Sequence, residues 1–166
     1  MKRHQFFVGL LLLAVALPCI GWAGPPQPYQ VGESLPAVIL KDQFDVPLPL
    51  DAKVRSLVFS REMASKDMIE ALLTDEGAGF LAEHEAVYLA DISKMPSLIT
   101  KMFALPKMKE YPFRLFLDLD GSLTARIPVQ AGKVTLLFLD DRQIQAIRYI
   151  ADKAELKAEL SRGSLP

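Results

Sequence analysis

Two short, almost uninterrupted apolar runs constrain the fold of this chain more than any other feature. They read VRSLVFS (54–60) and AVYLADI (86–92). A strand that is apolar on both faces must be covered on both faces, which is typical of a strand inside a parallel sheet. The segment between them, 62–77, has Ala64, Met68 and Leu72 about one helical turn apart on one expected face and ends at Gly77, which predicts a helix. The chain is therefore predicted to be an α/β protein.

The rest of the chain continues this alternation. Further strands are expected at 36–40, 113–118, 133–139 and 144–150, and helices at 93–105 and 152–163. The prolines of 41–50 suit an edge strand, and 133–150 should form an antiparallel hairpin. We expect a central mixed, mostly parallel sheet flanked by helices.

Two expectations concern side-chain placement within the predicted helices. In the helix at 93–105, Leu98, Met102 and Leu105 form one apolar face, Ser93 can cap the start, and Pro106 should end the helix. The methionines at 63, 68, 95, 102 and 108 are also spaced as in helices, and we expect them in the core.

The amino terminus has the three parts of a secretory signal peptide. A basic start (MKRHQ) precedes an apolar run (FFVGLLLLAVALPCI) and small residues (GWAG), with cleavage expected near Ala23. The apolar run is shorter than the roughly 18–20 residues of a membrane span, and Pro18 interrupts it. A retained anchor and a lipid-modified Cys19 are the alternatives, and Pro18 before the cysteine disfavours the second. The predicted divisions are a signal peptide (1–23), an extended proline-rich leader (24–31), one domain (32–162) and a tail (163–166).

Export would place the protein in the periplasm or outside the cell, with no stable membrane anchor and without Cys19, the only cysteine. Beyond residue 23 the chain has 17 basic and 20 acidic residues, a formal charge of −3. This balance, without basic runs, argues against a nucleic-acid or anionic-lipid surface. No glycine-rich nucleotide-binding loop occurs, so no cofactor is expected. The partner is expected to be a periplasmic protein or peptide.

One acidic motif suggests a different function. FRLFLDLDGSLT (113–124) resembles the start of a haloacid-dehalogenase-type phosphatase, with Asp118 as nucleophile and Asp120 as proton donor. Such an enzyme needs several more strand–helix units, whereas only 46 residues follow Asp120. We therefore interpret the motif as a turn. A cation held by Asp118 and Asp120 with Asp140 and Asp141 is a weaker alternative, since oxygen-ligand sites need about six converging ligands.

The order of the predicted elements resembles that of a thioredoxin-like domain. Three stretches also resemble the secreted peroxiredoxin- and TlpA-like branch of that superfamily: VGESLPAVILKDQFD (31–45), YPFRLFLDLDGSL (111–123) and VTLLFLDDRQIQAI (134–147). The first helix region, KVRSLVFSREMASKDMIEAL (53–72), and the second of these stretches are most similar to the periplasmic YtfJ-type proteins, a cysteine-free offshoot.

The resemblance implies where the working surface should lie and what it lacks. Thioredoxin-type enzymes carry Cys-x-x-Cys at the start of the first helix, where this chain has Met63 to Lys66, and a cis-proline opposite, where it has Val134. Thiol–disulfide and peroxidase chemistry are therefore not expected. The resemblance implies that a peptide-binding groove remains beside the first helix. We call its predicted residues the partner corner: Arg61, Glu62, Met63, Ser65 and Lys66 with Gly132, Lys133 and Val134.

The function favoured by these observations is a redox-inactive, non-catalytic binding or accessory module. The alternative is an enzyme of unrecognised chemistry that uses the polar residues from Ser60 to Asp67. Ser60 or Ser65 is instead expected to cap the helix, and a serine beside a lysine is not an activated nucleophile without a demonstrated hydrogen bond. His84 is expected on the surface, and no catalytic or metal-binding residue is assigned.

Overall fold

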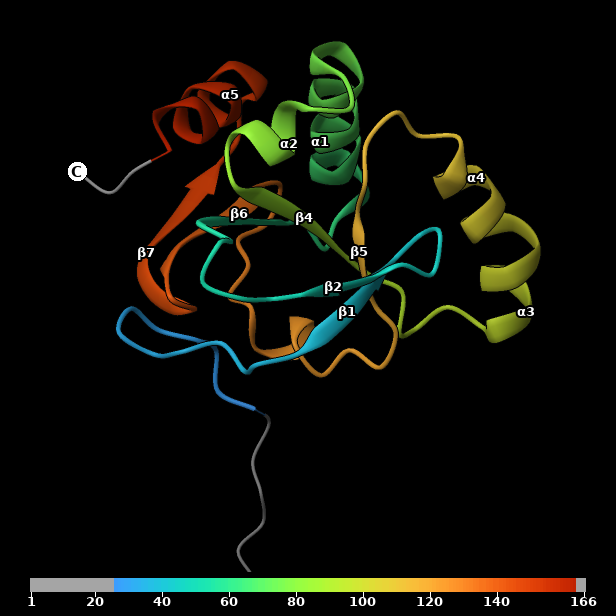
Figure 1. The fold of residues 1–166 in the computed structure, drawn as a ribbon, viewed down its shortest axis with the longest axis horizontal. Coiled ribbons are helices and arrows are strands. Elements are labelled where there is room, and N and C mark those ends of the chain that lie inside the picture. Colours follow the sequence, from blue (N-terminus) through green and yellow to red (C-terminus); the bar gives the residue numbers. More distant parts are fainter. Residues whose placement is uncertain (1–25, 164–166) are drawn as a thin grey trace, which may run out of the picture.

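The structure, a computed structural model, describes residues 26–163 (Figure 1). The predicted signal peptide and residues 164–166 of the predicted tail lie outside the described residues. Helices of the described chain are α1 (Met63–Glu76), α2 (Phe80–Glu83), α3 (Ser97–Ile99), α4 (Leu105–Lys109) and α5 (Lys153–Arg162), with a π-helical turn η1 (Thr100–Ala104) and a 3₁₀ turn η2 (Thr124–Arg126). None of these helices is long and apolar enough to cross a membrane.

A seven-stranded sheet forms the centre of the molecule. Its strands are β1 (Ile39–Asp42), β2 (Pro47–Pro49), β3 (Ser56–Phe59), β4 (Ala86–Asp91), β5 (Phe116–Asp118), β6 (Val134–Asp140) and β7 (Gln143–Ile150). They lie in the order β2-β1-β5-β4-β3-β6-β7. The two apolar runs became the adjacent central strands β3 and β4, and the proline-containing β2 is an edge strand, as predicted.

The sheet is mixed, as expected, but it is less parallel than expected. Two of its six pairings are parallel, β3 with β4 and β4 with β5, and the other four are antiparallel. The reason is that hairpins extend the sheet on both sides, β1–β2 at one edge and β6–β7 at the other. A hairpin needs only a short turn, whereas each parallel pairing needs a crossover segment.

The two faces of the sheet are covered differently. One face packs against α1, α2, α4 and α5 through residues such as Ile69, Leu73 and Leu156. The other face is covered mainly by irregular chain and η2, through residues such as Tyr29, Leu35 and Ile127. Helices therefore flank the sheet principally on one side, which refines the expectation of a sheet flanked by helices.

The first helix matches its predicted range almost residue for residue, yet its inward face is rotated. Ala64 is exposed, whereas Ser65, Ile69, Leu72 and Leu73 are buried. Gly77 follows the helix with φ +88°, a conformation that favours glycine, and it ends the helix as expected.

The helix predicted at 93–105 lies three to four residues later and continues past Pro106. α3, η1 and α4 run on from Ser97 to Lys109, and Ser93 bonds to Asp91 instead of capping. Pro106 has no N–H to donate to the previous turn. A π-helical turn lies directly before it and departs from the regular α-helical hydrogen-bond pattern.

The predicted leader is not a free extension where the structure describes it. Tyr29 is buried, its ring lies under the Arg126 guanidinium at 4.1 Å, and its N–H donates to the Arg126 carbonyl. Glu33 in turn accepts a hydrogen bond from Arg126 at 2.8 Å. Residues 26–33 therefore belong to the packed domain.

Candidate functional site: a cavity at the carboxyl ends of the parallel strands

The three parallel strands end at one edge of the sheet and bring polar residues together there. Register pairs Phe59 with Leu89 and Asp91 with Asp118, so the residues that follow β3, β4 and β5 are neighbours. These are Ser60 and Arg61 after β3, Asp91 at the end of β4 and Asp118 at the end of β5. In open α/β sheets this edge is where ligands bind.

The two halves of the predicted partner corner meet in the fold. The Glu62 carboxylate accepts a hydrogen bond from the Gly132 N–H at 2.7 Å, joining residues 70 positions apart. Glu62 is the N-cap residue of α1, but its side chain makes no capping bond because it turns towards Gly132. Gly132 has φ +71°, which holds the turn before β6 in the left-handed region.

The members of the partner corner are not equally accessible. Met63 is 70% exposed, and Arg61, Glu62 and Gly132 are also exposed. Ser65 and Val134 are buried, and Val134 packs in the core beside α1. Lys66 and Lys133 are half-buried. A partner can therefore reach the Val134 position only through its backbone, which is the kind of contact expected of the groove.

The two serines of the corner serve the start of the helix without capping it. Ser60 Oγ and Ser65 Oγ lie 2.5 Å apart, so one donates to the other, and both lie within hydrogen-bond distance of the Glu62 carbonyl oxygen, to which the remaining hydroxyl hydrogen can be donated. The expected cap by either hydroxyl is wrong, because α1 has no side-chain cap at its first residue. Within residues 26–163 neither hydroxyl bonds a histidine, a lysine or a carboxylate, so the contacts that would activate a serine nucleophile are not formed.

A cavity of about 390 Å³ opens beside these residues. α1 contributes Met63 and Lys66, β4 contributes Tyr88 and Ala90, and the segment after β4 contributes Lys94 and Met95. Met108 of α4 closes the far side. A second hollow, lined by Arg61, Asp91 and Lys94 together with Gly121, shares residues with the first, so the two adjoin.

Tyr88 is the most informative residue of the cavity wall. Its side chain is only 1% exposed, and its hydroxyl makes no hydrogen bond with the described residues. The hydroxyl is not among the fully enclosed unpaired atoms of residues 26–163, so the cavity reaches it. Burial, and then the nearby Glu70 carboxylate, raise the pKa of Tyr88, so it is neutral at physiological pH. A buried neutral hydroxyl without a partner is an open position for a hydrogen bond.

Cationic side chains lie at the cavity mouth, and they differ in how many contacts they already make within the protein. Arg61 donates to the Thr124 carbonyl and lies over the Phe59 ring. The Lys66 ammonium nitrogen lies 3.6 Å from the Glu70 Oε1 atom. Lys94 makes neither a hydrogen bond nor an ion pair with any described residue. Lys94 is therefore the cation most available to a ligand.

Asp118 has the geometry of a turn residue. Its Oδ1 accepts from the Gly121 N–H, and its Oδ2 accepts from the N–H groups of Leu123 and Thr124. The side chain is 2% exposed, so both oxygens are used within the protein. Asp120, which is exposed, accepts from the Ser122 N–H, and this bond lowers the pKa of Asp120. This arrangement agrees with the interpretation of the motif as a turn.

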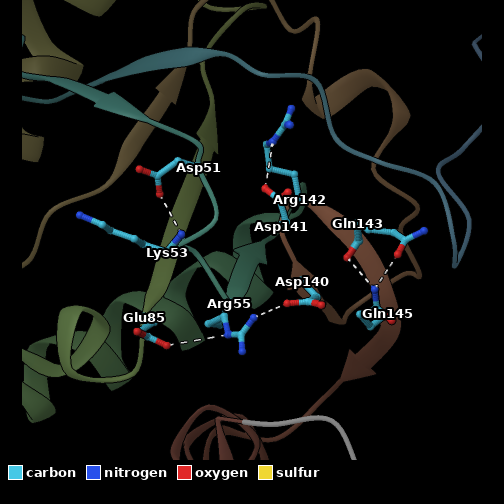
Figure 2. A network of polar contacts seen from close by, with 9 residues as sticks. All are labelled: Asp51, Lys53, Arg55, Glu85, Asp140, Asp141, Arg142, Gln143 and Gln145. Carbon is cyan, nitrogen blue, oxygen red and sulfur yellow. Dashed lines mark hydrogen bonds and ion pairs between the residues drawn. The ribbon is translucent and has the colours of Figure 1, made fainter.

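The cation alternative required two acidic pairs that the fold separates. Asp140 and Asp141 lie at the β6–β7 turn, beside the amino-terminal end of β3, where Asp140 pairs with Arg55 (Figure 2). Asp118 and Asp120 lie at the opposite ends of the strands, where β5 ends. No group of three or more metal-binding side chains occurs among residues 26–163. The four aspartates therefore do not form one site.

Comparison with solved structures identifies the architecture. A peroxidoxin (BcpB) from Mycobacterium tuberculosis matches over 82% of this chain and 98% of its own, with TM-score 0.52 and 17% identity. A thio-disulfide isomerase from Thermus thermophilus matches over 83% and 99%, with TM-score 0.52 and 22% identity. The chain has the thioredoxin-like fold. A peroxiredoxin-like protein from Aquifex aeolicus shares it at 9% identity, TM-score 0.53, over 84% of this chain and 91% of its own.

The thioredoxin-like fold is what these likenesses show. No protein-family model and no curated protein sequence matches the chain. Residues 26–163 contain no cysteine, so the described domain has this fold without a thiol.

Sequence reasoning found the rim of the cavity but missed its interior. Tyr88, Lys94, Met95 and Met108 were not predicted as site residues, and the methionines were expected in the core. Of the five methionines, Met63 and Met102 are exposed and only Met108 is fully buried. One available signal was the tyrosine inside an otherwise apolar strand, because a buried tyrosine hydroxyl usually has a partner.

Proposed function

We propose that this protein is an exported binding module with a thioredoxin-like fold, and that it binds an extended peptide segment of a partner protein in the cavity beside α1. It performs no thiol–disulfide or peroxidase chemistry, and within the fold it belongs with the periplasmic YtfJ-type proteins. Its signal peptide directs export and is then removed by cleavage near Ala23.

The observation that carries this proposal is the unpaired Tyr88 hydroxyl in a cavity with apolar walls. Met63, Met95 and Met108 line the same cavity, and methionine side chains adapt to apolar groups of different shapes. One apolar side chain of a peptide with a hydrogen-bonding tip would fit between them and engage Tyr88. Ligand sites commonly combine such apolar walls with a few placed polar groups.

The neighbouring backbone supports an extended peptide over a compact small molecule. The hollow next to the cavity continues past Asp91 towards Gly121, which offers a path for chain on one side of the seated residue. On the other side the Gly132 turn lies against Glu62. Extended peptides gain affinity along such surfaces from main-chain contacts and specificity from side-chain pockets.

Selection from a random peptide display library tests the binding function. We expect enriched peptides to share one apolar position, and Tyr88→Phe to weaken their binding about five- to tenfold, the typical loss of one hydrogen bond. Phe44→Ser, at an exposed phenylalanine of the β1–β2 hairpin, is the matched control and should leave affinity unchanged. Failure to enrich any peptide, or equal affinity for wild type and Tyr88→Phe, would refute the proposal.

The export part of the proposal has its own test. Protein recovered from the periplasm or the medium should carry no thiol, because Cys19 lies before the expected cleavage site. A thiol-reactive mass tag should therefore add nothing to the intact mass. A shift of one tag would show that Cys19 is retained and would restore the anchored alternative.

A further inference from the structure

The helical segment from α3 to α4 presents its apolar side chains to solvent. Leu98, Ile99, Met102 and Phe103 are all exposed, Phe103 at 62%. The inward side of the same segment is formed by Thr100, Ala104 and Met108, which recur every four residues. The exposed apolar residues and the inward residues thus lie on different sides of the segment. The usual amphipathic arrangement of a surface helix is therefore reversed.

Lysines without partners surround this apolar face. Lys94, Lys101, Lys107 and Lys109 are exposed, and none of them makes an ion pair or a hydrogen bond through its side chain with residues 26–163. No aspartate or glutamate occurs from 92 to 109. We call residues 94–109 the basic arm.

The charge of the folded molecule is strongly divided between this arm and the rest. The basic arm carries four lysines and no acid, whereas the remainder of residues 26–163 has 13 basic and 20 acidic residues. The charge balance of the whole chain hid this division, because the four lysines are spread over 16 positions. An anionic surface would attract the arm and repel the rest of the domain, and so orient the molecule.

We propose that the basic arm docks on the surface of a membrane containing anionic phospholipids. Its apolar side chains enter the interface, and its lysines lie at the headgroups with their stems along the apolar surface. The domain lies on the membrane without crossing it. This inference does not rest on peptide binding, because the four exposed apolar residues of the arm and its lysines Lys101, Lys107 and Lys109 do not line the cavity, although Lys94, Met95 and Met108 of the arm do.

The shape of the arm favours a lipid surface over a protein. The helical segment that carries these four exposed side chains lies at the periphery of the molecule (Figure 1), and none of them lines the cavity beside α1 or the hollow that adjoins it. A bilayer interface accepts such side chains without a shaped receptor. A protein would have to supply both a groove and an acidic rim.

Lysine acylation of the full chain shows which lysines contact the membrane. Because each lysine is measured separately, binding of the amino-terminal segment to the vesicles does not imitate contact by the arm. The protein is labelled with vesicles of phosphatidylcholine alone, or of phosphatidylcholine with phosphatidylglycerol, and each lysine is quantified by mass spectrometry. We expect anionic vesicles to protect Lys101, Lys107 and Lys109 at least about threefold, and to leave Lys53 unchanged. Equal labelling with both vesicles, or protection of Lys53 to the same extent, would overturn the proposal.

Matched variants test the two components separately. Lys107→Gln should weaken binding to anionic vesicles about fivefold, from about 1 kcal/mol per lysine near such a surface, and Lys53→Gln should not. Phe103→Ser should weaken it by about tenfold, while Phe44→Ser, another exposed phenylalanine, should not. Salt at 0.5 M should largely abolish binding. If the arm variants bind vesicles as well as their controls, or if the arm captures only an acidic protein and no vesicle, the proposal is wrong.

Discussion

The two ends of the central strands differ in how completely their polar groups are paired. At the amino-terminal ends of β3 and β4, Arg55 lies between Glu85 and Asp140, and the neighbouring β6–β7 turn carries its own polar contacts (Figure 2). At the carboxyl ends, the Tyr88 hydroxyl and the Lys94 ammonium have no partner among residues 26–163. The charged side chains at the first end are paired within the chain, although the buried Ser56 hydroxyl there has no partner among the described residues, whereas at the second end a cation is unpaired as well.

This difference distinguishes an end whose charges are neutralised within the chain from an end that offers a cation and a hydroxyl to a ligand. Paired charges at the first end need nothing from outside, and each exposed pair contributes at most about 1 kcal/mol. A buried hydroxyl left open costs free energy unless a ligand satisfies it. The proposed peptide site lies at this second end, beside α1, where a ligand could pair with the Tyr88 hydroxyl.

The largest expected effect comes from comparing one carboxylate at each end. Asp118→Ala leaves three buried backbone N–H groups without an acceptor, so we expect a loss of about 3 kcal/mol in the free energy of unfolding. Asp140→Ala removes an exposed ion pair and should cost less than about 1 kcal/mol. Urea unfolding measures both. A similar loss for the two variants would mean that the Asp118 turn is not held as described.

Replacing Tyr88 separates stability from binding at the open end. Tyr88→Phe removes a buried hydroxyl that lacks a partner, so the free energy of unfolding should stay the same or rise by up to about 1 kcal/mol. The same change should weaken peptide binding, as proposed above. Thermal unfolding with and without a selected peptide measures both quantities. Clear destabilisation of the free protein would show that the hydroxyl has a structural partner and that the end is not open.

Charge reversal at Lys94 should have a smaller effect, on rates. Lys94→Glu places an acid at the cavity mouth and should slow association of an acidic peptide a few-fold, with dissociation nearly unchanged. Lys53→Glu, at an exposed lysine near the paired end, is the control. Stopped-flow measurements at two salt concentrations would check this, because the difference between the variants should shrink as salt rises. Equal slowing by both reversals would mean that the effect comes from the net charge of the molecule and not from the position of Lys94.

The comparison also shows which features the sequence could predict. The apolar runs of β3 and β4, the range of α1 and the β6–β7 hairpin were predicted because each pattern has one physical solution. The basic arm was not, because two stripes there compete at helical spacing. Leu98 and Met102 form the more apolar stripe, yet Thr100 and Met108 face the sheet. Local spacing cannot show which stripe tertiary packing will bury.

The candidate site was predictable only in part, for a similar reason. The rim residues Arg61, Glu62 and Lys66 could be predicted because they lie at the turn between β3 and α1, and the resemblance to thioredoxin-like domains locates that turn. The cavity behind them requires Met108, which lies 45 positions after Met63 along the chain. Its closure depends on the path of α4, and the π-helical turn that sets this path has no clear signal in sequence.

The smallest expected effect concerns the paired end and its dependence on pH. Glu33 lies near the start of β7, and its hydrogen bond from Arg126 lowers the pKa of Glu33 from its usual 4.5. A carboxyl whose pKa is lower in the folded state stabilises the protein above the unfolded pKa, and this stabilisation is lost as pH falls through the folded value. The attachment of residues 26–33 should therefore loosen below about pH 4.5. Hydrogen exchange at the Tyr29 N–H, corrected for the intrinsic rate, should accelerate in that window, and Glu33→Gln should remove the pH dependence. An unchanged profile in Glu33→Gln would mean that another group titrates there, and that the paired end is closed by contacts other than Glu33 with Arg126.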